Sequence, residues 1–362
     1  MQENSSATSP ALNMNILLTG GLGFIGSHTA VELLQQGHTV VLYDNLCNTT
    51  STVADRIETI TGRSAHVVIG DIRDRTLLEK TLKDFAIDLV IHFAALKAVG
   101  ESVVKPLEYY DNNITGTLTL LAAMRSAAVS RIIFSSSATV YGEPESLPLT
   151  EESALHDATN PYGRTKRMVE EILADICQAD PTFCAVNLRY FNPIGAHPSG
   201  LIGEDPNGIP NNLLPYVARV AKGALKEVQV FGSDYPTLDG TGVRDFIHVV
   251  DLAIGHVKAI DYAMKHTGWI AFNLGCGHGF SVLEVIKAFE QASARHIPYR
   301  LVPRRAGDIA ESYCSPARAE ALLGWKAERG LAEMCRDAWN FELKSGSAVA
   351  AQNVLPDETH QS

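Results

Sequence analysis

Short β-branched runs alternate with amphipathic segments along the first half of the chain, beginning at Met14. The runs are almost continuously apolar, which is typical of strands that are covered on both faces. This alternation predicts an α/β fold with a doubly wound parallel sheet and helices on both of its faces. Strands are predicted over residues 16–19, 39–42, 67–69, 89–93, 131–134 and 184–188, and a first helix over residues 27–36.

After about Tyr190 the chain changes to loops rich in Gly, Pro and Asn, with shorter helices predicted over residues 212–222 and 282–292. We expect a smaller C-terminal α/β lobe beside the carboxyl edge of the sheet, where α/β folds bind ligands. The predicted division is a sheet domain over residues 14–190 and a ligand-binding lobe over residues 191–344, some segments of which can return to the first domain. Polar tails are predicted over residues 1–13 and 345–362, and either Met1 or Met14 could be the natural start.

The charge balance and the cysteines exclude several classes of protein. The 362 residues include 30 Lys and Arg against 41 Asp and Glu, a formal net charge of −11, which disfavours nucleic acid and anionic lipid surfaces as partners. No apolar run in the chain approaches the roughly 20 residues of a membrane span, and residues 1–13 lack the pattern of a signal peptide. The six cysteines show no Cys-x-x-Cys pair or zinc-type spacing, so we expect reduced thiols, no metal and a cytoplasmic location.

A glycine-rich turn follows the first predicted strand and places Gly20, Gly23 and Gly26 at Gly-x-x-Gly-x-x-Gly spacing. Between a strand and a helix, such glycines let the backbone approach a pyrophosphate at the helix N-terminus, as in a Rossmann domain. Asp44 ends the second strand, where a carboxylate binds ribose hydroxyls and favours NAD over NADP. A turn without a ligand is the alternative. The chain has no Gly-Lys dipeptide, which excludes a P-loop.

A second motif joins a tyrosine and a lysine. Asn160 is a good N-cap and Pro161 suits the first helical position, so a helix should begin here with Tyr162 and Lys166 on one face. A nearby ammonium and the positive helix end favour the phenolate, which makes Tyr162 a candidate general base. Ser137 lies at the end of an upstream strand, where it should face the same crevice. An unrelated surface pair is the alternative for Tyr-x-x-x-Lys alone.

These motifs resemble the extended short-chain dehydrogenase/reductase superfamily and, within it, the UDP-glucose 4-epimerase (UDP-galactose 4-epimerase) family. The resemblance extends from Met14 to about Asn340. Besides the glycine turn and Tyr-x-x-x-Lys, it rests on residues 44–48, 70–73, 92–102, 109–113, 134–142, 189–193 and 239–249.

The resemblance implies a Rossmann domain that binds NAD and a lobe that binds a UDP-sugar. It also implies interconversion of UDP-glucose and UDP-galactose by transient oxidation at sugar C4, a place in galactose metabolism, and a homodimer. The implied catalytic residues are Tyr162 as base, Lys166, and Ser137 as the hydrogen-bond partner of O4. The implied NAD-binding residues are Gly20, Gly23, Phe24, Ile25, Gly26, Asp44, Asn45, Leu46, Cys47, Asn48, Thr49, Asp71, Ile72, Phe93, Ala94, Ala95, Leu96, Lys97, Asn112, Ser137, Tyr162, Lys166 and Phe191. The implied UDP-sugar residues are Ser137, Tyr162, Asn192, Asn212, Leu213, Phe231, Arg244, Arg305, Asp308 and Ser312.

Two other functions remain open at this point. A nucleotide-sugar 4,6-dehydratase shares the fold and the first oxidation, but those relatives carry an acidic pair after the strand-end hydroxyl, where this chain has Ala138 and Thr139. A non-catalytic NAD-binding regulator with this fold is the other alternative. The presence of Ser137, Tyr162 and Lys166 argues against it.

The resemblance also bears on substrate range. Four residues after Asp308 some family members carry Tyr and others a small residue, and this chain has Ser312. A side chain of this size leaves room for an N-acetyl group on sugar C2, which suggests UDP-GlcNAc and UDP-GalNAc as additional substrates. Tyr313 could instead fill the same space, and Ser312 could simply be a small loop residue.

Overall fold

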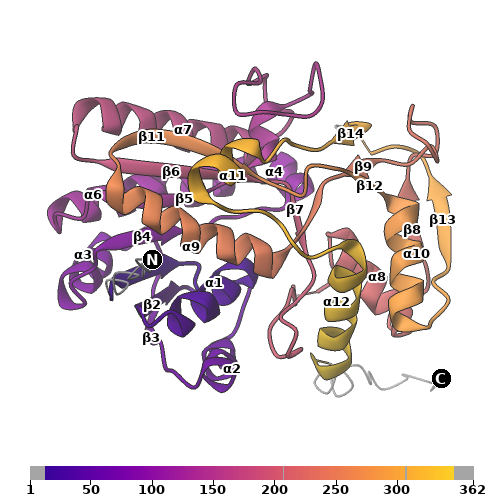
Figure 1. The fold of residues 1–362 in the computed structure, drawn as a ribbon, viewed down its shortest axis with the longest axis horizontal. Coiled ribbons are helices and arrows are strands. Elements are labelled where there is room, and N and C mark those ends of the chain that lie inside the picture. Colours follow the sequence, from indigo (N-terminus) through magenta and orange to yellow (C-terminus); the bar gives the residue numbers. More distant parts are fainter. Residues whose placement is uncertain (1–12, 207, 306–307, 346–362) are drawn as a thin grey trace, which may run out of the picture.

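The computed structural model describes residues 13–206, 208–305 and 308–345, so the predicted tails lie outside the described residues except for residues 13 and 345. Seven parallel strands form the main sheet in the order β11-β6-β5-β4-β1-β2-β3 (Figure 1). The predicted doubly wound α/β fold is therefore confirmed. The strands are β1 (Asn15–Thr19), β2 (Thr39–Asp44), β3 (His66–Ile69), β4 (Leu89–His92), β5 (Arg131–Ser137), β6 (Cys184–Tyr190) and β11 (Gly268–Leu274).

Helices cover both faces of this sheet (Figure 1). On one face lie α1 (Phe24–Gln35), α2 (Thr52–Thr61), α9 (Val249–Lys265) and α11 (Ala317–Leu323), and on the other lie α3 (Arg75–Asp84), α6 (Gly116–Ser126) and α7 (Pro161–Ala179). Shorter elements on the second side are α4 (Val99–Val104), α5 (Pro106–Tyr110), the π-helical turn η1 (Asp111–Thr115) and the 3₁₀ turn η2 (Ala138–Tyr141).

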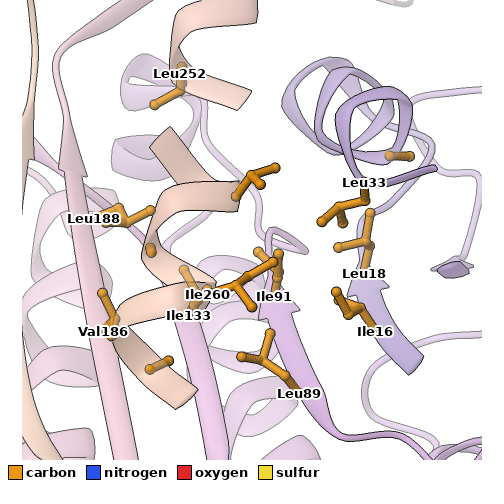
Figure 2. Close-up of a cluster of buried hydrophobic side chains, with 14 of the residues drawn as sticks. Ile16, Leu18, Leu33, Leu89, Ile91, Ile133, Val186, Leu188, Leu252 and Ile260 are labelled. Carbon is orange, nitrogen blue, oxygen red and sulfur yellow. The ribbon is translucent and has the colours of Figure 1, made fainter. Parts of the chain in front are cut away.

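Successive strand residues pack into opposite halves of the core because side chains alternate across a strand. Ile16 and Leu18 contact the α1 and α9 side, where Leu33 and Ile260 join them (Figure 2). Leu17, between them in sequence, packs in the other half against residues of α3, α6 and α7. All five side chains are at most 3% exposed, so the sheet is buried on both faces.

The sequence analysis did not predict β11. This strand comes from the part of the chain after residue 190 and pairs with β6 along its whole length. The helix before it, α9, packs against α1 (Figure 1). Residues 249–274 therefore add a helix and an edge strand to the main sheet.

The second lobe consists of small sheets and three helices around a separate core. Its helices are α8 (Leu213–Ala221), α10 (Val282–Ser293) and α12 (Leu331–Ser345), and α10 begins with a capping box between Ser281 and Glu284. Its strands are β7 (Asn192–Ile194), β8 (Val228–Phe231), β9 (Val243–Arg244), β10 (Phe246–His248), β12 (Phe280–Ser281), β13 (Tyr299–Val302) and β14 (Glu311–Ser312). Among the described residues, no helix combines the length and apolar character needed to cross a bilayer.

Three buried histidines predict a loss of stability in acid. Burial lowers the pKa of His28 and of His92 to about 3, and that of His256 to about 4. In the unfolded chain these histidines bind protons below their ordinary pKa of about 6.5. In the folded chain they stay neutral until the pH falls to the lower pKa values given above. As the pH falls through this interval, each histidine lowers the free energy of unfolding by up to about 1.4 kcal/mol per pH unit.

We therefore expect the urea midpoint to fall steadily between pH 6.5 and pH 4.5. His28→Gln should reduce this pH dependence, whereas His296→Gln should not, because His296 is 85% exposed. A midpoint that stays constant over this range would contradict the prediction.

Candidate active site

One large cleft, of about 1610 Å³, lies along the carboxyl edge of the main sheet and extends into the second lobe. Its wall includes residues at the ends of five strands: Gly20 after β1, Asp44 in β2, Phe93 after β4, Ser137 in β5 and Phe191 after β6. Residues of α8, β8, β9 and β14 form the side that belongs to the second lobe. Pockets for a single small ligand usually enclose roughly 300–1,000 Å³, so this cleft has room for a cofactor and a substrate together.

The cleft brings together nearly all the site residues expected from the sequence. Those on its wall are Gly20, Gly23, Phe24, Ile25, Gly26, Asp44, Asn45, Cys47, Asn48, Thr49, Ile72, Phe93, Ala94, Ala95, Leu96, Lys97, Asn112, Ser137, Tyr162, Lys166, Phe191, Asn192, Asn212, Leu213, Phe231, Arg244, Arg305, Asp308 and Ser312.

Leu46 and Asp71 are the two expected site residues that lie off the wall described for the cleft. Leu46 packs against the apolar core under α1. The Asp71 carboxylate pairs with Arg73, with 2.8 Å between Oδ1 and Nε, and accepts a hydrogen bond from Asn45 at 3.0 Å. The Arg73 hydrogen bonds hold the pKa of Asp71 well below its usual range.

The glycine turn has the geometry that a pyrophosphate site requires. Gly20 has a φ of +68°, and a Cβ on Gly26 would lie 2.4 Å from the Gly20 carbonyl oxygen. The N-cap of α1 is Gly23, which makes no side-chain capping hydrogen bond, so the first N–H groups of α1 are left to a ligand. This cradle fits a dinucleotide phosphate.

Asp44 is buried beside this turn. Its carboxylate accepts hydrogen bonds from the backbone N–H groups of Leu22 at 3.1 Å and of Leu46 at 2.9 Å. Burial raises the pKa of Asp44, and these two hydrogen bonds act in the opposite direction. A carboxylate offers about four acceptor positions, so two remain for ribose hydroxyls.

Local sequence determines how the tyrosine and the lysine enter the cleft. The side chain of Asn160 accepts a hydrogen bond from Gly163 N at 2.9 Å, and Pro161 is the first residue of α7, as predicted. Both Tyr162 and Lys166 line the cleft. The ammonium of Lys166 donates to the Ser135 carbonyl at 2.5 Å and lies 5.9 Å from the centre of the Tyr162 ring.

Electrostatics at this tyrosine differ in one respect from the sequence expectation. Burial raises the pKa of Tyr162, while its hydrogen bond with Ser137 and the charge of Lys97 lower it. Lys97 is half exposed in the cleft and pairs with Glu204 at 2.9 Å. The sequence predicts that Lys166 acts on the phenol and carries no signal for the Lys97–Glu204 pairing, since these two residues are 107 positions apart in the chain.

The second lobe supplies arginines and an aromatic ring. The Arg305 guanidinium lies 4.7 Å from the centre of the Phe231 ring and pairs with Asp308 at 2.9 Å. Burial lowers the pKa of Arg244, and the nearby Asp308 carboxylate acts against this. Cations of this kind bind phosphates through charge-assisted hydrogen bonds.

Ser312 lies deep in this part of the cleft. It pairs with Arg244 between β14 and β9, and only 9% of its surface is exposed. Tyr313 is not among the described residues of the cleft wall. Ser312, and not Tyr313, therefore lies on the cleft wall.

Two hydroxyls that sequence reasoning missed also line the cleft. The buried side-chain oxygens of Thr139 and Tyr235 have no hydrogen-bond partner among the described residues. No sequence motif marked either residue as part of the site, apart from the closeness of Thr139 to Ser137 in the chain.

Comparisons with known proteins agree with this geometry. The family model described as GDP-mannose 4,6 dehydratase matches residues 17–338. The chain is 57% identical over 329 residues to the UDP-glucose 4-epimerase of Haemophilus influenzae, which covers 91% of this chain and 97% of that protein.

Two solved structures are also similar. The UDP-glucose 4-epimerase of Bifidobacterium longum in complex with NAD⁺ and UDP has 56% identity and a TM-score of 0.89, with 91% of this chain and 98% of that chain covered. The UDP-glucose-4-epimerase of Stenotrophomonas maltophila with bound NAD and formylated UDP-arabinopyranose has 52% identity and a TM-score of 0.90, with 92% and 99% covered.

Proposed function

The chain belongs to the UDP-glucose 4-epimerase family of the extended short-chain dehydrogenases/reductases, and we propose that it carries out this family's NAD-dependent reaction with Tyr162 as the base. The reaction interconverts UDP-glucose and UDP-galactose, within galactose metabolism. The observation that carries the assignment of roles is that Ser137, Tyr162, Lys97 and Lys166 lie together on the wall of one cleft with room for two ligands. The chain has Ala138 and Thr139 after Ser137, so it lacks the carboxylates of a dehydratase.

The residues around the glycine turn fit NAD. The N–H groups at the start of α1 would hold the pyrophosphate, and Asp44 would accept hydrogen bonds from the adenosine ribose. When bound there, NAD supplies the acceptor and then the donor of the hydride at sugar C4, with a 4-keto sugar between the two half-reactions.

Proton transfer falls to the residues of the chain itself. Tyr162 as phenolate accepts the proton of the 4-hydroxyl while Ser137 holds O4 by a hydrogen bond, and Tyr162 returns the proton when the hydroxyl forms again. Arg244 and Arg305 hold the diphosphate, so the sugar can turn over without leaving the cleft. A sugar that has turned in this way would present the other face of C4 for return of the hydride, with inversion of its configuration.

The direct test uses the protein as purified, without any added oxidant or cofactor. We expect it to convert UDP-galactose to UDP-glucose, measured by chromatography of the sugars, and to release NAD when it is denatured. Absence of interconversion in protein that does contain NAD would overturn the proposed function.

Substrate range is a further part of the proposal. Ser312 supports activity on UDP-GlcNAc and UDP-GalNAc, since a small, buried cleft residue leaves space beside the sugar. Ser312→Tyr is expected to lower kcat/KM for the N-acetylated pair by roughly five- to 150-fold, because overfilling a packed site costs about 1–3 kcal/mol. The effect on UDP-glucose and UDP-galactose should be smaller.

The matched control is Tyr313→Ser, which changes the neighbouring residue that lies off the cleft wall. It should leave the ratio of the two activities unchanged. Failure of the wild type to act on UDP-GlcNAc would exclude this part of the proposal, as would equal selectivity of Ser312→Tyr and the wild type.

A homodimer is proposed as well. Large apolar side chains are exposed on α4 and α5, where Val104 is 75% and Leu107 is 79% accessible, and both helices contact α7, which carries the exposed Met168. A second copy of the chain would cover this surface. We expect Leu107→Glu to shift the mass in solution toward the monomer, measured by light scattering, whereas Leu322→Glu on α11 should not. A wild-type monomer would contradict this prediction.

A cytoplasmic location is also retained as a prediction. No disulfide joins the six cysteines in the described part of the chain, as is usual in a reducing compartment. Cell fractionation would test this, and recovery of the protein with an exported fraction would contradict it.

A further inference from the structure

A buried ion pair lies directly behind the candidate catalytic residues. Glu170 on α7 and Arg189 on β6 pair at 2.6 Å between Oε2 and Nη2, and their side chains are only 3% and 2% exposed. Glu170 follows Lys166 by four residues, so the two side chains lie on the same side of α7. Arg189 lies opposite Ser136 in the β5–β6 register, next to Ser137.

Both carboxylate oxygens of Glu170 and all three guanidinium nitrogens of Arg189 form hydrogen bonds. Glu170 Oε1 accepts hydrogen bonds from Ser136 Oγ at 2.5 Å and from Arg189 Nε at 3.0 Å. Arg189 Nη1 donates to the Tyr141 hydroxyl at 3.1 Å, which in turn donates to Asn273 at 2.6 Å. The network thus joins α7, β5, η2, β6 and β11 at the floor of the cleft.

Stability is a weak explanation for such a pair. The desolvation of two charges often exceeds their mutual attraction, and buried pairs can often be replaced by apolar side chains at little cost. The position of the network points instead to Lys166, a residue that is 4% exposed and whose ammonium lies 4.8 Å from the centre of the Phe134 ring. An ammonium in such surroundings needs a negative charge nearby to stay protonated.

We propose that Glu170 is a positioning residue of the reaction, whose carboxylate, fixed by Arg189 and Ser136, keeps Lys166 charged and directed toward Ser135 beside Tyr162. This inference rests on the proposed function of the cleft. It gives the buried pair a role in proton transfer, although neither of its members lies on the cleft wall.

Electrostatics of the neighbouring groups support this assignment. Burial lowers the pKa of Lys166 to about 7, and the charge of Glu170 acts against this decrease. Loss of Glu170 would also leave the Arg189 charge uncompensated, which disfavours the ammonium further. The titratable and charged groups around Lys166 are Tyr162 and Glu170 on α7, His92 on β4, and Arg189 and Tyr190 on β6, with Lys97 facing Tyr162. Burial lowers the pKa of His92 to about 3, so His92 stays neutral in the working range.

Opposite substitutions should therefore shift the titration of Lys166 in opposite directions. Glu170→Gln is expected to move the alkaline limb of the kcat/KM profile to lower pH by about one unit, which is a loss of about tenfold at pH 8 and less than threefold at pH 6. Arg189→Met should move the same limb to higher pH. A purely structural role would instead lower activity by the same factor at every pH.

The experiment compares pH profiles of NAD-containing wild type and variants with UDP-galactose as substrate. Glu171→Gln is the matched control, because Glu171 is the next residue on α7 and its side chain is 59% exposed. Glu170→Asp keeps the charge and should retain most of the wild-type profile.

A Glu170→Gln profile parallel to the wild type would overturn the inference while leaving the proposed function intact. An inactive wild type would instead overturn the proposed function. If Glu170→Gln does not fold with NAD, the Arg189→Met variant tests the inference. An alkaline limb of its kcat/KM profile that stays in place or moves to lower pH would overturn the inference.

Discussion

Replacement of Tyr162 by phenylalanine is expected to lower turnover of UDP-galactose by about 10²–10⁴-fold, the usual contribution of a positioned general base. The phenol lies on the cleft wall together with Ser137, and the charge of Lys97 acts on it. Burial raises the pKa of this phenol and so favours its protonated form. The nearby positive charge acts in the opposite direction and favours the phenolate. Without the hydroxyl, the proton of the sugar 4-hydroxyl has no acceptor at the reacting oxygen.

The same variant should bind UDP as the wild type does, because the diphosphate and the uracil are assigned to Arg244, Arg305 and Phe231 in the other lobe. Turnover and UDP affinity are measured side by side, by sugar chromatography and calorimetry. Tyr299→Phe serves as a control, since Tyr299 lies on β13, away from the cleft wall. Turnover by Tyr162→Phe within a few-fold of the wild type would exclude Tyr162 as the base.

Local signals made much of this site predictable from the sequence. The apolar runs that become β1, β2 and β4 are buried on both faces, so they contain no polar alternation to confuse the assignment. The start of α7 is encoded within four residues, with Asn160 as the cap and Pro161 in the first turn. The ends of parallel strands meet at one edge, so Ser137 and Tyr162 could be placed in one crevice before any coordinates were known.

Features that depend on distant parts of the chain were not predictable in this way. The strand β11 finds its partner in β6 across the whole of α8 and α9, and no short-range pattern specifies that pairing. The Lys97–Glu204 pair joins residues that are 107 positions apart in the chain. The network of Glu170 and Arg189 depends on α7 packing against β5 and β6, so its residues had no motif of their own.

Substitution of Gly26 by alanine is expected to weaken the retention of NAD. A Cβ at this position would lie 2.4 Å from the Gly20 carbonyl oxygen and 2.8 Å from the Gly21 Cα. Both are backbone atoms, so no change of rotamer can relieve the contact and the turn itself must move. Overpacking of this kind costs about 1–3 kcal/mol, which corresponds to roughly five- to 150-fold in NAD affinity.

The displaced turn would no longer present the first N–H groups of α1 to the pyrophosphate, so the variant should be purified with little NAD and little activity. NAD released on denaturation gives the direct measurement, and added NAD should restore part of the turnover because the residues of α7 are unchanged. Gly330→Ala is the matched control, since a Cβ there would meet nothing within 4 Å. If Gly26→Ala kept as much NAD as Gly330→Ala, the close packing of Gly26 on Gly20 could not be what shapes the cofactor site.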